Sequence, residues 1–167
     1  MKQKINVNDY ADLITAMLPK GVLLNTQGEK FNSMVIGWGH LGTLWGKSTF
    51  VVYVRQSRYT KKLIDEAKEF SVSVPLKEID PKIFKICGTM SGRDIDKVRE
   101  AGLTLVDGET IRTPAVKEYP LTLECKVLYQ QDQDLGKIPE EIVNRMYADG
   151  DFHTMYVGEI VDAYIIQ

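Results

Sequence analysis

The sequence predicts a mainly β fold: an antiparallel barrel with a few short peripheral helices. Many segments alternate or run apolar over the lengths typical of strands. Helical patterns are few and short, which favours a barrel over a parallel sheet of βαβ units. At 167 residues the chain has the length of one domain, and we assign residues 1–167 to a single domain.

The first predicted elements are a helix and a hairpin. Residues 8–18 carry an apolar stripe at helical spacing, and Asn8 can cap the helix that they form. Residues 21–25 and 31–36 then have the pattern of two strands joined by a turn.

A further strand, a helix and another strand follow. Residues 49–54 are an apolar strand that ends at Arg55, and residues 58–70 have helical spacing. Ser57 is the predicted N-cap, because its hydroxyl can accept a hydrogen bond from a free backbone N–H of the first turn. Residues 70–75 alternate as a half-buried strand.

The remaining elements come in the second half of the chain. Pro81 begins a short helix that ends at Cys87. Ser91 and Asp94 have capping-box spacing before a helix that ends at Gly102. Pro139 stands near the first position of another helix. Strands are predicted at residues 103–106, 110–113, 121–131 and 155–166.

A cationic cluster before the helix of residues 58–70 predicts an anion site. Arg55 and Arg58 flank Ser57, and a helix N-terminus offers unpaired N–H groups and a partial positive charge. Two arginines there can add charge-assisted hydrogen bonds to a phosphate. The alternative is a capped surface helix with solvated arginines, and these residues alone leave both interpretations open.

Residues 37–42 match the dinucleotide-binding pattern G-x-G-x-x-G by letter only. That pattern requires a helix that opens at the third glycine and an acidic residue about 20 positions further on. Here a β-rich stretch broken by Gly46 follows, and Lys61 and Lys62 stand at that offset. We therefore reject a Rossmann-type site.

Composition and charge argue against several classes of partner. A net charge of −2 and a pI near 5.7 give no electrostatic reason for binding nucleic acid. The apolar runs are far shorter than the ~20 residues needed to cross a membrane. The N-terminus lacks the apolar core of a signal peptide. We expect a cytoplasmic protein that binds neither nucleic acid nor membrane.

Cysteine and histidine are too scattered to predict a familiar catalytic or metal site. Cys87 and Cys125 form no C-x-x-C pair. A zinc site built on His40 and His153 would need carboxylates from unrelated segments, so no metal is implied. No nucleophile-elbow motif supports Ser/His/Asp hydrolysis, and the sequence identifies no catalytic residue.

Several separated segments resemble one known family. The motifs NSMVIGWG, LGTLWGK and VYVRQSRYT, all within residues 32–60, look like the flavin reductase-like family. Residues 87–97 look like its CGxxSGRDxDK segment. Residues 120–127 and 153–160 are similar to members of its flavoredoxin-like branch. The resemblance covers residues 8–167, in order and at the expected spacing.

The resemblance implies an FMN-binding split β-barrel that assembles as a homodimer, with FMN at each interface. Strand 32–36 would run along the flavin ring, Trp38 would form an aromatic wall, and Lys97 would place a positive charge near the pyrimidine end. His153 and Tyr156 would approach from the partner subunit. The implied cofactor-binding residues are Asn32, Ser33, Met34, Val35, Ile36, Trp38, Arg55, Ser57, Arg58, Tyr59, Thr60, Cys87, Ser91, Gly92, Lys97 and His153.

Some residues depart from the family pattern, and others have ordinary explanations. Val35 stands where members often carry threonine, so a hydroxyl that could reach the flavin is absent. Ser48 and Gln56 replace loop-stiffening prolines, but the phosphate cluster is intact, so we expect binding to survive. By residue type alone, Trp38 could be a core anchor and Lys97 a solvated surface lysine.

The long strands 121–131 and 155–166 also favour a dimer, because uncovered apolar edges would invite aggregation.

Three functions are compatible with the resemblance. The first is an FMN-containing reductase that takes hydride from NADH or NADPH and passes electrons to flavin or another small acceptor. The second is a flavoredoxin-like carrier that exchanges electrons with protein partners. The third is an FMN-binding module without turnover.

Overall fold

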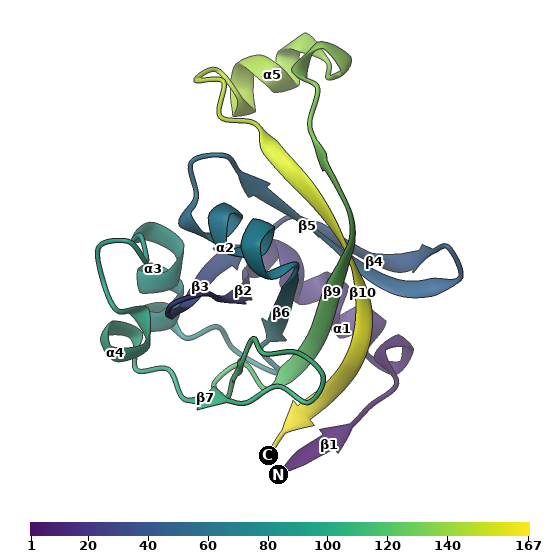
Figure 1. The fold of residues 1–167 in the computed structure, drawn as a ribbon, viewed down its shortest axis with the longest axis vertical. Helices are drawn as coiled ribbons and strands as arrows, with labels where there is room; N and C mark the ends of the chain where they lie inside the picture. Colours follow the sequence, from purple (N-terminus) through teal and green to yellow (C-terminus); the bar gives the residue numbers. More distant parts are fainter.

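The computed structural model describes all 167 residues, and one antiparallel sheet of eight strands forms its centre (Figure 1). The strand order is β3-β2-β6-β9-β10-β5-β4, with β1 paired to β10. The strands of this sheet are β1 (Lys2–Lys4), β2 (Val22–Gln27), β3 (Phe31–Ile36), β4 (Gly39–Leu44), β5 (Lys47–Arg55), β6 (Glu69–Val74), β9 (Leu121–Asp132) and β10 (His153–Ile166).

Five short α-helices and a two-stranded ribbon surround the sheet. Helices α3 and α4 lie together beside β3, on the left in Figure 1. These elements are α1 (Ala11–Met17), α2 (Tyr59–Ala67), α3 (Pro81–Thr89), α4 (Lys97–Ala101), α5 (Glu140–Met146), β7 (Leu105–Val106) and β8 (Ala115–Val116). None of the helices has the length and apolar character needed to span a membrane.

The hydrophobic core lies on two sides of the β2–β3 region. A cluster of 19 buried residues, with Phe50, Phe70 and Tyr156 among its largest, fills the inside of the curved sheet. A second cluster packs Leu23 and Phe31 against Ile83 of α3. Because β2 is covered on both faces, its apolar residues are consecutive instead of alternating.

Most of the segment from the G-x-G-x-x-G match at residues 37–42 to Arg55 is a hairpin of β4 and β5. Trp45 and Gly46 both have positive φ, at 53° and 72°, which is the conformation of a two-residue type I′ turn. Gly46 therefore does not break the β structure; it closes the hairpin. This strand pairing also excludes the helix that a dinucleotide-binding loop would require.

Four predicted helix starts are wrong in detail. Asn6, not Asn8, caps the 3-10 turn Val7–Tyr10 that precedes α1, and its side chain accepts from the N–H of Asn8. Arg58 is the N-cap residue of α2, and Asp96, not Ser91, caps α4. Pro139 is the N-cap residue of α5 instead of its first residue. The helices themselves are confirmed, so the errors concern only the residues that cap them.

The segment between β7 and β8 is not the strand predicted at residues 110–113. Buried Glu124 of β9 holds it through bonds from the backbone N–H groups of Glu109 and Thr110. Glu69 accepts from the N–H groups of Arg112 and Thr113. Two carboxylates thus replace a β ladder as partners of this backbone.

Residues 133–152, here named the arm, project from the ends of β9 and β10 at the top of Figure 1. The arm carries α5 and is tied to the sheet by Arg55. The two terminal nitrogens of Arg55 donate to the carbonyl oxygens of Asp151, at 2.7 Å, and Met146, at 2.9 Å. The end of β5 is therefore fixed to the arm.

Candidate functional site

Two adjoining hollows open beside β3 and the start of α2. The α3–α4 segment bounds the first, and the ends of β5 and β10 bound the second. The hollows have volumes of about 120 Å³ and 200 Å³, and Met34, Val35 and Arg58 line both. The first hollow is also lined by Asn32, Ser57, Tyr59, Thr60, Cys87, Gly88, Met90, Ser91, Gly92, Arg93 and Lys97. The second is also lined by Ile36, Gly37, Trp38, Tyr53, Arg55 and His153.

Lys97 is a buried cation in the wall of the first hollow, with 4% of its surface exposed. Its Nζ donates to the carbonyl oxygens of Ser33, at 2.7 Å, and Cys87, at 3.2 Å. Burial lowers the pKa of Lys97 to about 8. The alternative of a solvated surface lysine is therefore wrong, and Lys97 ties β3 to α3.

Asn32 presents a buried polar group to the same hollow. Its Nδ2 donates to Oγ1 of Thr60 at 2.9 Å, whereas its Oδ1 is buried without a partner. A Cβ on Gly92 would lie 2.1 Å from that oxygen, so only glycine lets this segment approach so closely. A buried amide oxygen without a donor is costly unless a ligand supplies one.

Cys87 lines the first hollow as a neutral thiol. Burial raises its pKa, and the lowering effects of Lys97 and Ser33 do not outweigh burial. Cys125 is fully buried in β9 and lines neither hollow. The cysteines therefore provide no reactive thiolate at this site.

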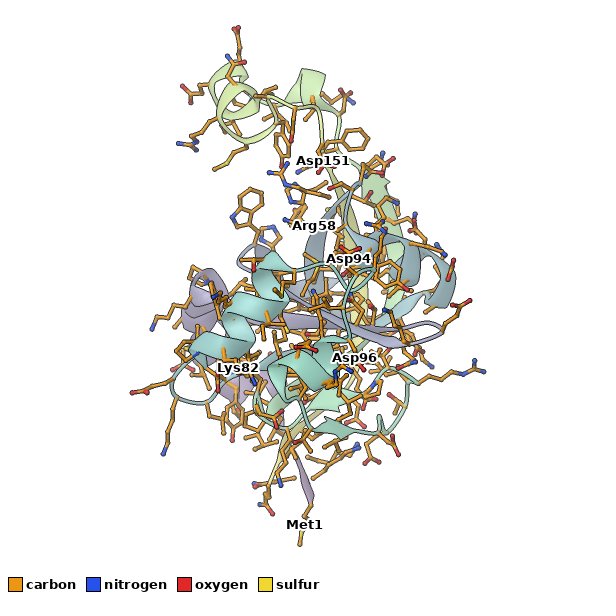
Figure 2. All side chains as sticks on the ribbon, turned by 90° about the vertical axis from the view of Figure 1, so that its left-hand side faces the viewer. Met1, Arg58, Lys82, Asp94, Asp96 and Asp151 are labelled. Carbon is orange, nitrogen blue, oxygen red and sulfur yellow. The ribbon has the colours of Figure 1, made fainter.

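The start of α2 provides the positive end of the site. The N–H groups of Tyr59 and Thr60 belong to the first helical turn, where no intrahelical acceptor exists. The guanidinium of Arg58 forms no hydrogen bond or ion pair with the protein and lines both hollows. In Figure 2, Arg58 lies between Asp151 and the segment that carries Asp94. This corner is suited to a phosphate.

Two members of the predicted phosphate cluster, Arg55 and Ser57, form hydrogen bonds with other residues of the protein. Arg55 binds the arm, and the Oγ and N–H of Ser57 both donate to the carboxylate of Asp151, at 2.5 Å and 3.0 Å. Burial would raise the pKa of Asp151, but the bonds from Ser57 and the nearby arginines outweigh it and hold that pKa below its ordinary value.

Arg93, and not Arg55, is the second arginine that lines the first hollow beside Arg58. Its guanidinium donates to the carbonyl oxygen of Ser57 at 3.0 Å and lies 5.4 Å from the centre of the Tyr59 ring. Sequence reasoning included Arg93 in the SGRD motif but gave it no contact. Nothing in the local sequence showed that the α3–α4 segment folds back onto α2.

Aromatic rings and a neutral histidine surround the second hollow. Trp38 is 45% exposed, so it is not a core anchor, and its ring lies 5.0 Å from that of His153. Nδ1 of His153 is 2.8 Å from the hydroxyl of Tyr147. Burial, with a smaller effect from Arg55, lowers the pKa of His153 to about 4. His153 is therefore uncharged at neutral pH.

Tyr156 does not face either hollow. Its side chain is fully buried, and its hydroxyl donates to Oδ1 of Asp65 at 2.7 Å. The expectation that it approaches a flavin from the partner subunit is wrong. His153, in contrast, lies beside the hollow of its own chain.

Every predicted cofactor-binding residue except Ser33 lines one of the two hollows. Ser33 lies behind the wall, where its carbonyl oxygen accepts from Lys97. The prediction missed Gly37, Tyr53, Gly88, Met90 and Arg93 as lining residues. Together these residues offer a polar cleft with an unpaired buried acceptor, a cation and a phosphate corner, which fits a planar ligand bearing a terminal phosphate.

Comparisons with known proteins agree with that geometry. Residues 16–167 match the model of the flavin reductase like domain. An uncharacterized protein of Archaeoglobus fulgidus is 30% identical over 155 residues, which cover 92% of this chain and 77% of that protein.

The solved structures of two flavoredoxins are also similar. The flavoredoxin of Desulfovibrio vulgaris (Miyazaki F) has 26% identity and that of Methanosarcina acetivorans 28%, both with a TM-score of 0.68. Each match covers 88% of this chain and 69% or 68% of the other. An FMN-binding domain from Shewanella baltica, 18% identical over 99% of this chain and 77% of its own, shares the fold with a TM-score of 0.70.

These matches confirm the mainly β split-barrel fold and support a flavin cofactor and a redox function. The chain belongs to the flavin reductase-like family.

Proposed function

We propose that this protein is an FMN-dependent oxidoreductase that takes electrons from NADH or NADPH and passes them to flavin or another small acceptor. The observation that carries this proposal is the unpaired guanidinium of Arg58 at the N-terminus of α2, beside a polar cleft. A helix N-terminus with one free arginine is suited to a single terminal phosphate, as in FMN.

The other residues of the first hollow would hold and tune the ring. Asn32 offers a buried amide oxygen, and Lys97 offers a cation that can stabilise negative charge on the ring system. Val35 provides an apolar wall. When bound, FMN would supply the electron chemistry, while the protein positions it and sets its potential.

The protein is further proposed to act as a homodimer. The two adjoining hollows, at about 120 Å³ and 200 Å³, together only just reach the roughly 300 Å³ at which ligand pockets begin, and both are open to solvent. A second subunit covering their open side would complete the pocket. In this arrangement His153 belongs to the same chain as the phosphate corner, and the partner adds only the outer wall.

A flavoredoxin-like electron carrier is the second candidate function. The 26% and 28% identity to two flavoredoxins supports it. A carrier would bind the same cofactor but exchange electrons with a protein partner and react slowly with nicotinamide nucleotides.

Two measurements test these proposals. Denaturing the purified protein should release FMN and little FAD, and a colourless protein that ignores added FMN would contradict the cofactor. Anaerobic mixing of the loaded protein with NADH and with NADPH should bleach the flavin absorbance. Retained colour with both donors, but bleaching by dithionite, would instead support the carrier.

A further inference from the structure

Tyr156 of β10 lines neither hollow, yet its hydroxyl is tied to α2. The ring is fully buried in the large core cluster, and the hydroxyl donates to Oδ1 of Asp65 at 2.7 Å. Nζ of Lys61 donates to Oδ2 of the same carboxylate at 2.6 Å and to the Tyr156 hydroxyl at 3.3 Å. These three side chains, here named the β10–α2 triangle, join a central strand of the sheet to the helix.

The β10–α2 triangle holds the first turn of α2, which is part of the phosphate corner. Lys61 is the third residue of the helix and follows Tyr59 and Thr60, whose N–H groups have no intrahelical acceptor. Asn32 of β3 holds the same turn through Oγ1 of Thr60. Because a helix moves as a rigid element, the side chains that anchor this turn decide where its free N–H groups point.

Thr154, two residues earlier in β10, anchors the chain just before the same corner. Its Oγ1 accepts from Nε2 of Gln56 at 2.7 Å. Residues two apart in a strand share a face, so Thr154 and Tyr156 lie on the same face of β10. That face therefore holds Gln56 before Arg58 and Lys61 after it.

The carboxylate of the β10–α2 triangle is ionised. Burial alone would raise the pKa of Asp65, but the bonds from Lys61 and Tyr156 outweigh it and hold that pKa below its ordinary value. Removal of the Tyr156 hydroxyl would leave Lys61 in place, and Asp65 would still be ionised at pH 7. Such a change alters how α2 is held without altering the charges around the phosphate corner.

We propose that Tyr156 is a positioning residue for the phosphate corner, and that it acts through Asp65 and Lys61 on the first turn of α2. The inference rests on the proposed function, in which this corner binds the phosphate of FMN. Riboflavin lacks that phosphate and would use the other walls of the hollows. The affinity for FMN should therefore depend on Tyr156, and the affinity for riboflavin should not.

The test compares Tyr156→Phe with Tyr164→Phe, a matched control on the same strand. Tyr164 is also fully buried, and its hydroxyl also donates to a carboxylate, that of Glu124, at 2.8 Å. Neither Tyr164 nor Glu124 lines a hollow of the site. Each variant keeps the ring and loses one hydroxyl. FMN and riboflavin are titrated by fluorescence into both variants and the unmodified protein, and urea denaturation measures the free energy of unfolding of each.

Tyr156→Phe should weaken FMN binding about tenfold, equivalent to the loss of one charge-assisted hydrogen bond to the phosphate, and leave riboflavin within about twofold. Tyr164→Phe should lower the free energy of unfolding similarly but leave both flavins within about twofold. A tyrosine that only stabilises the fold predicts other results. The inference is wrong if Tyr156→Phe leaves FMN unchanged, weakens both flavins equally, or weakens FMN no more than Tyr164→Phe does.

Asp65→Asn decides the question if Tyr156→Phe does not fold. The side chain of Asp65 is 34% exposed, so this change is the milder one for the core. Loss of an anion near the corner would by itself strengthen phosphate binding, whereas loss of positioning weakens it. Weaker FMN binding with unchanged riboflavin binding supports the inference, and unchanged or tighter FMN binding overturns it.

Failure of the proposed function would be recognised separately. If the unmodified protein binds neither flavin, the proposed cofactor is wrong, and inorganic phosphate is titrated calorimetrically into the same proteins. Weaker phosphate binding by Tyr156→Phe alone supports the positioning role of Tyr156. Equal phosphate affinity in all the proteins, or no phosphate binding by the unmodified protein, overturns it.

Discussion

Arg58 and Lys62 stand one turn apart on the same helix but have different surroundings. Arg58 lines both hollows of the site, and its guanidinium forms no hydrogen bond or ion pair with the protein. Lys62 is exposed and forms a long ion pair with Glu66 at 3.8 Å. The sequence placed both in one cationic run, and only the fold separates the residue that lines the hollows from the one that faces solvent.

Arg58→Ala should weaken FMN far more than Lys62→Ala. Removal of a charge-assisted contact to a phosphate costs about 1.5–3 kcal/mol, or roughly 10- to 100-fold in affinity. Removal of the exposed lysine should cost less than about 1 kcal/mol of binding free energy. Fluorescence titration with FMN provides the comparison, and equal losses would show that the phosphate lies elsewhere.

Lys97→Met should lower the two-electron reduction potential of bound FMN. The lysine charge favours the anionic reduced flavin over the neutral oxidised form, and loss of about 1 kcal/mol of that preference lowers the potential by roughly 20 mV. Spectroelectrochemical titration measures the shift. Lys85→Met, at an exposed position on α3, is the matched control.

Burial of Lys97 adds a second consequence of the same change. Methionine cannot donate to the carbonyl oxygens of Ser33 and Cys87, so the free energy of unfolding should fall by about 1–3 kcal/mol. An unchanged potential in a folded, FMN-loaded variant would remove Lys97 from the flavin site.

At the scale of elements, the sequence predicted the helices well but misplaced their caps. Ser57 has the right chemistry for an N-cap, but its hydroxyl is held by Asp151, which lies 94 residues away in the chain. Ser91 accepts from the N–H of Arg93 within a turn, and Asp96 begins the helix instead. Local pattern identifies the possible caps, whereas distant partners decide which one is used.

The loop that joins β7 to β8 depends on the charge of Glu124. Burial alone would raise the pKa of Glu124, but bonds from Glu109, Thr110 and Tyr164 outweigh it and lower that pKa. A lowered carboxyl pKa stabilises the fold above the ordinary carboxyl pKa, and this contribution is lost as the pH falls through the folded value.

Glu124→Gln should therefore reduce the free energy of unfolding by about 2–3 kcal/mol at pH 7, because neutral glutamine loses charge-assisted bonds. The difference from the unmodified protein should shrink as the pH falls below the ordinary glutamate pKa of about 4.3 and towards the lower pKa of folded Glu124. Urea denaturation at pH 7 and at several acidic pH values measures this. The control Glu66→Gln, on the surface of α2, should change the free energy of unfolding little. If the difference between Glu124→Gln and the unmodified protein persists unchanged in acid, the explanation is wrong.

For the whole molecule, the strand pattern predicted a mainly β barrel but not its connections. The long strands β9 and β10 were expected to leave apolar edges open. They instead pair with each other and with β6 and β5 inside the sheet, and the outermost strands of that path are β3 and β4. The arm could not be predicted, because its contacts with Arg55 and Ser57 join segments about 90 residues apart.

The FMN-loaded protein should be a dimer at micromolar concentration. With β9 and β10 covered, the reason is no longer an exposed edge but the small, open hollows that one chain provides for the ligand. Sedimentation velocity on loaded and flavin-free samples tests this. A stable monomer that retains FMN would show that one chain completes the pocket alone.

The position of Arg58 also implies antagonism between FMN and other anions. One guanidinium that borders both hollows cannot give full bonding to two phosphates at once, and two phosphates beside it repel each other. Inorganic phosphate bound at the start of α2 should therefore weaken the affinity for FMN. By thermodynamic linkage FMN must weaken the affinity for that phosphate by the same factor.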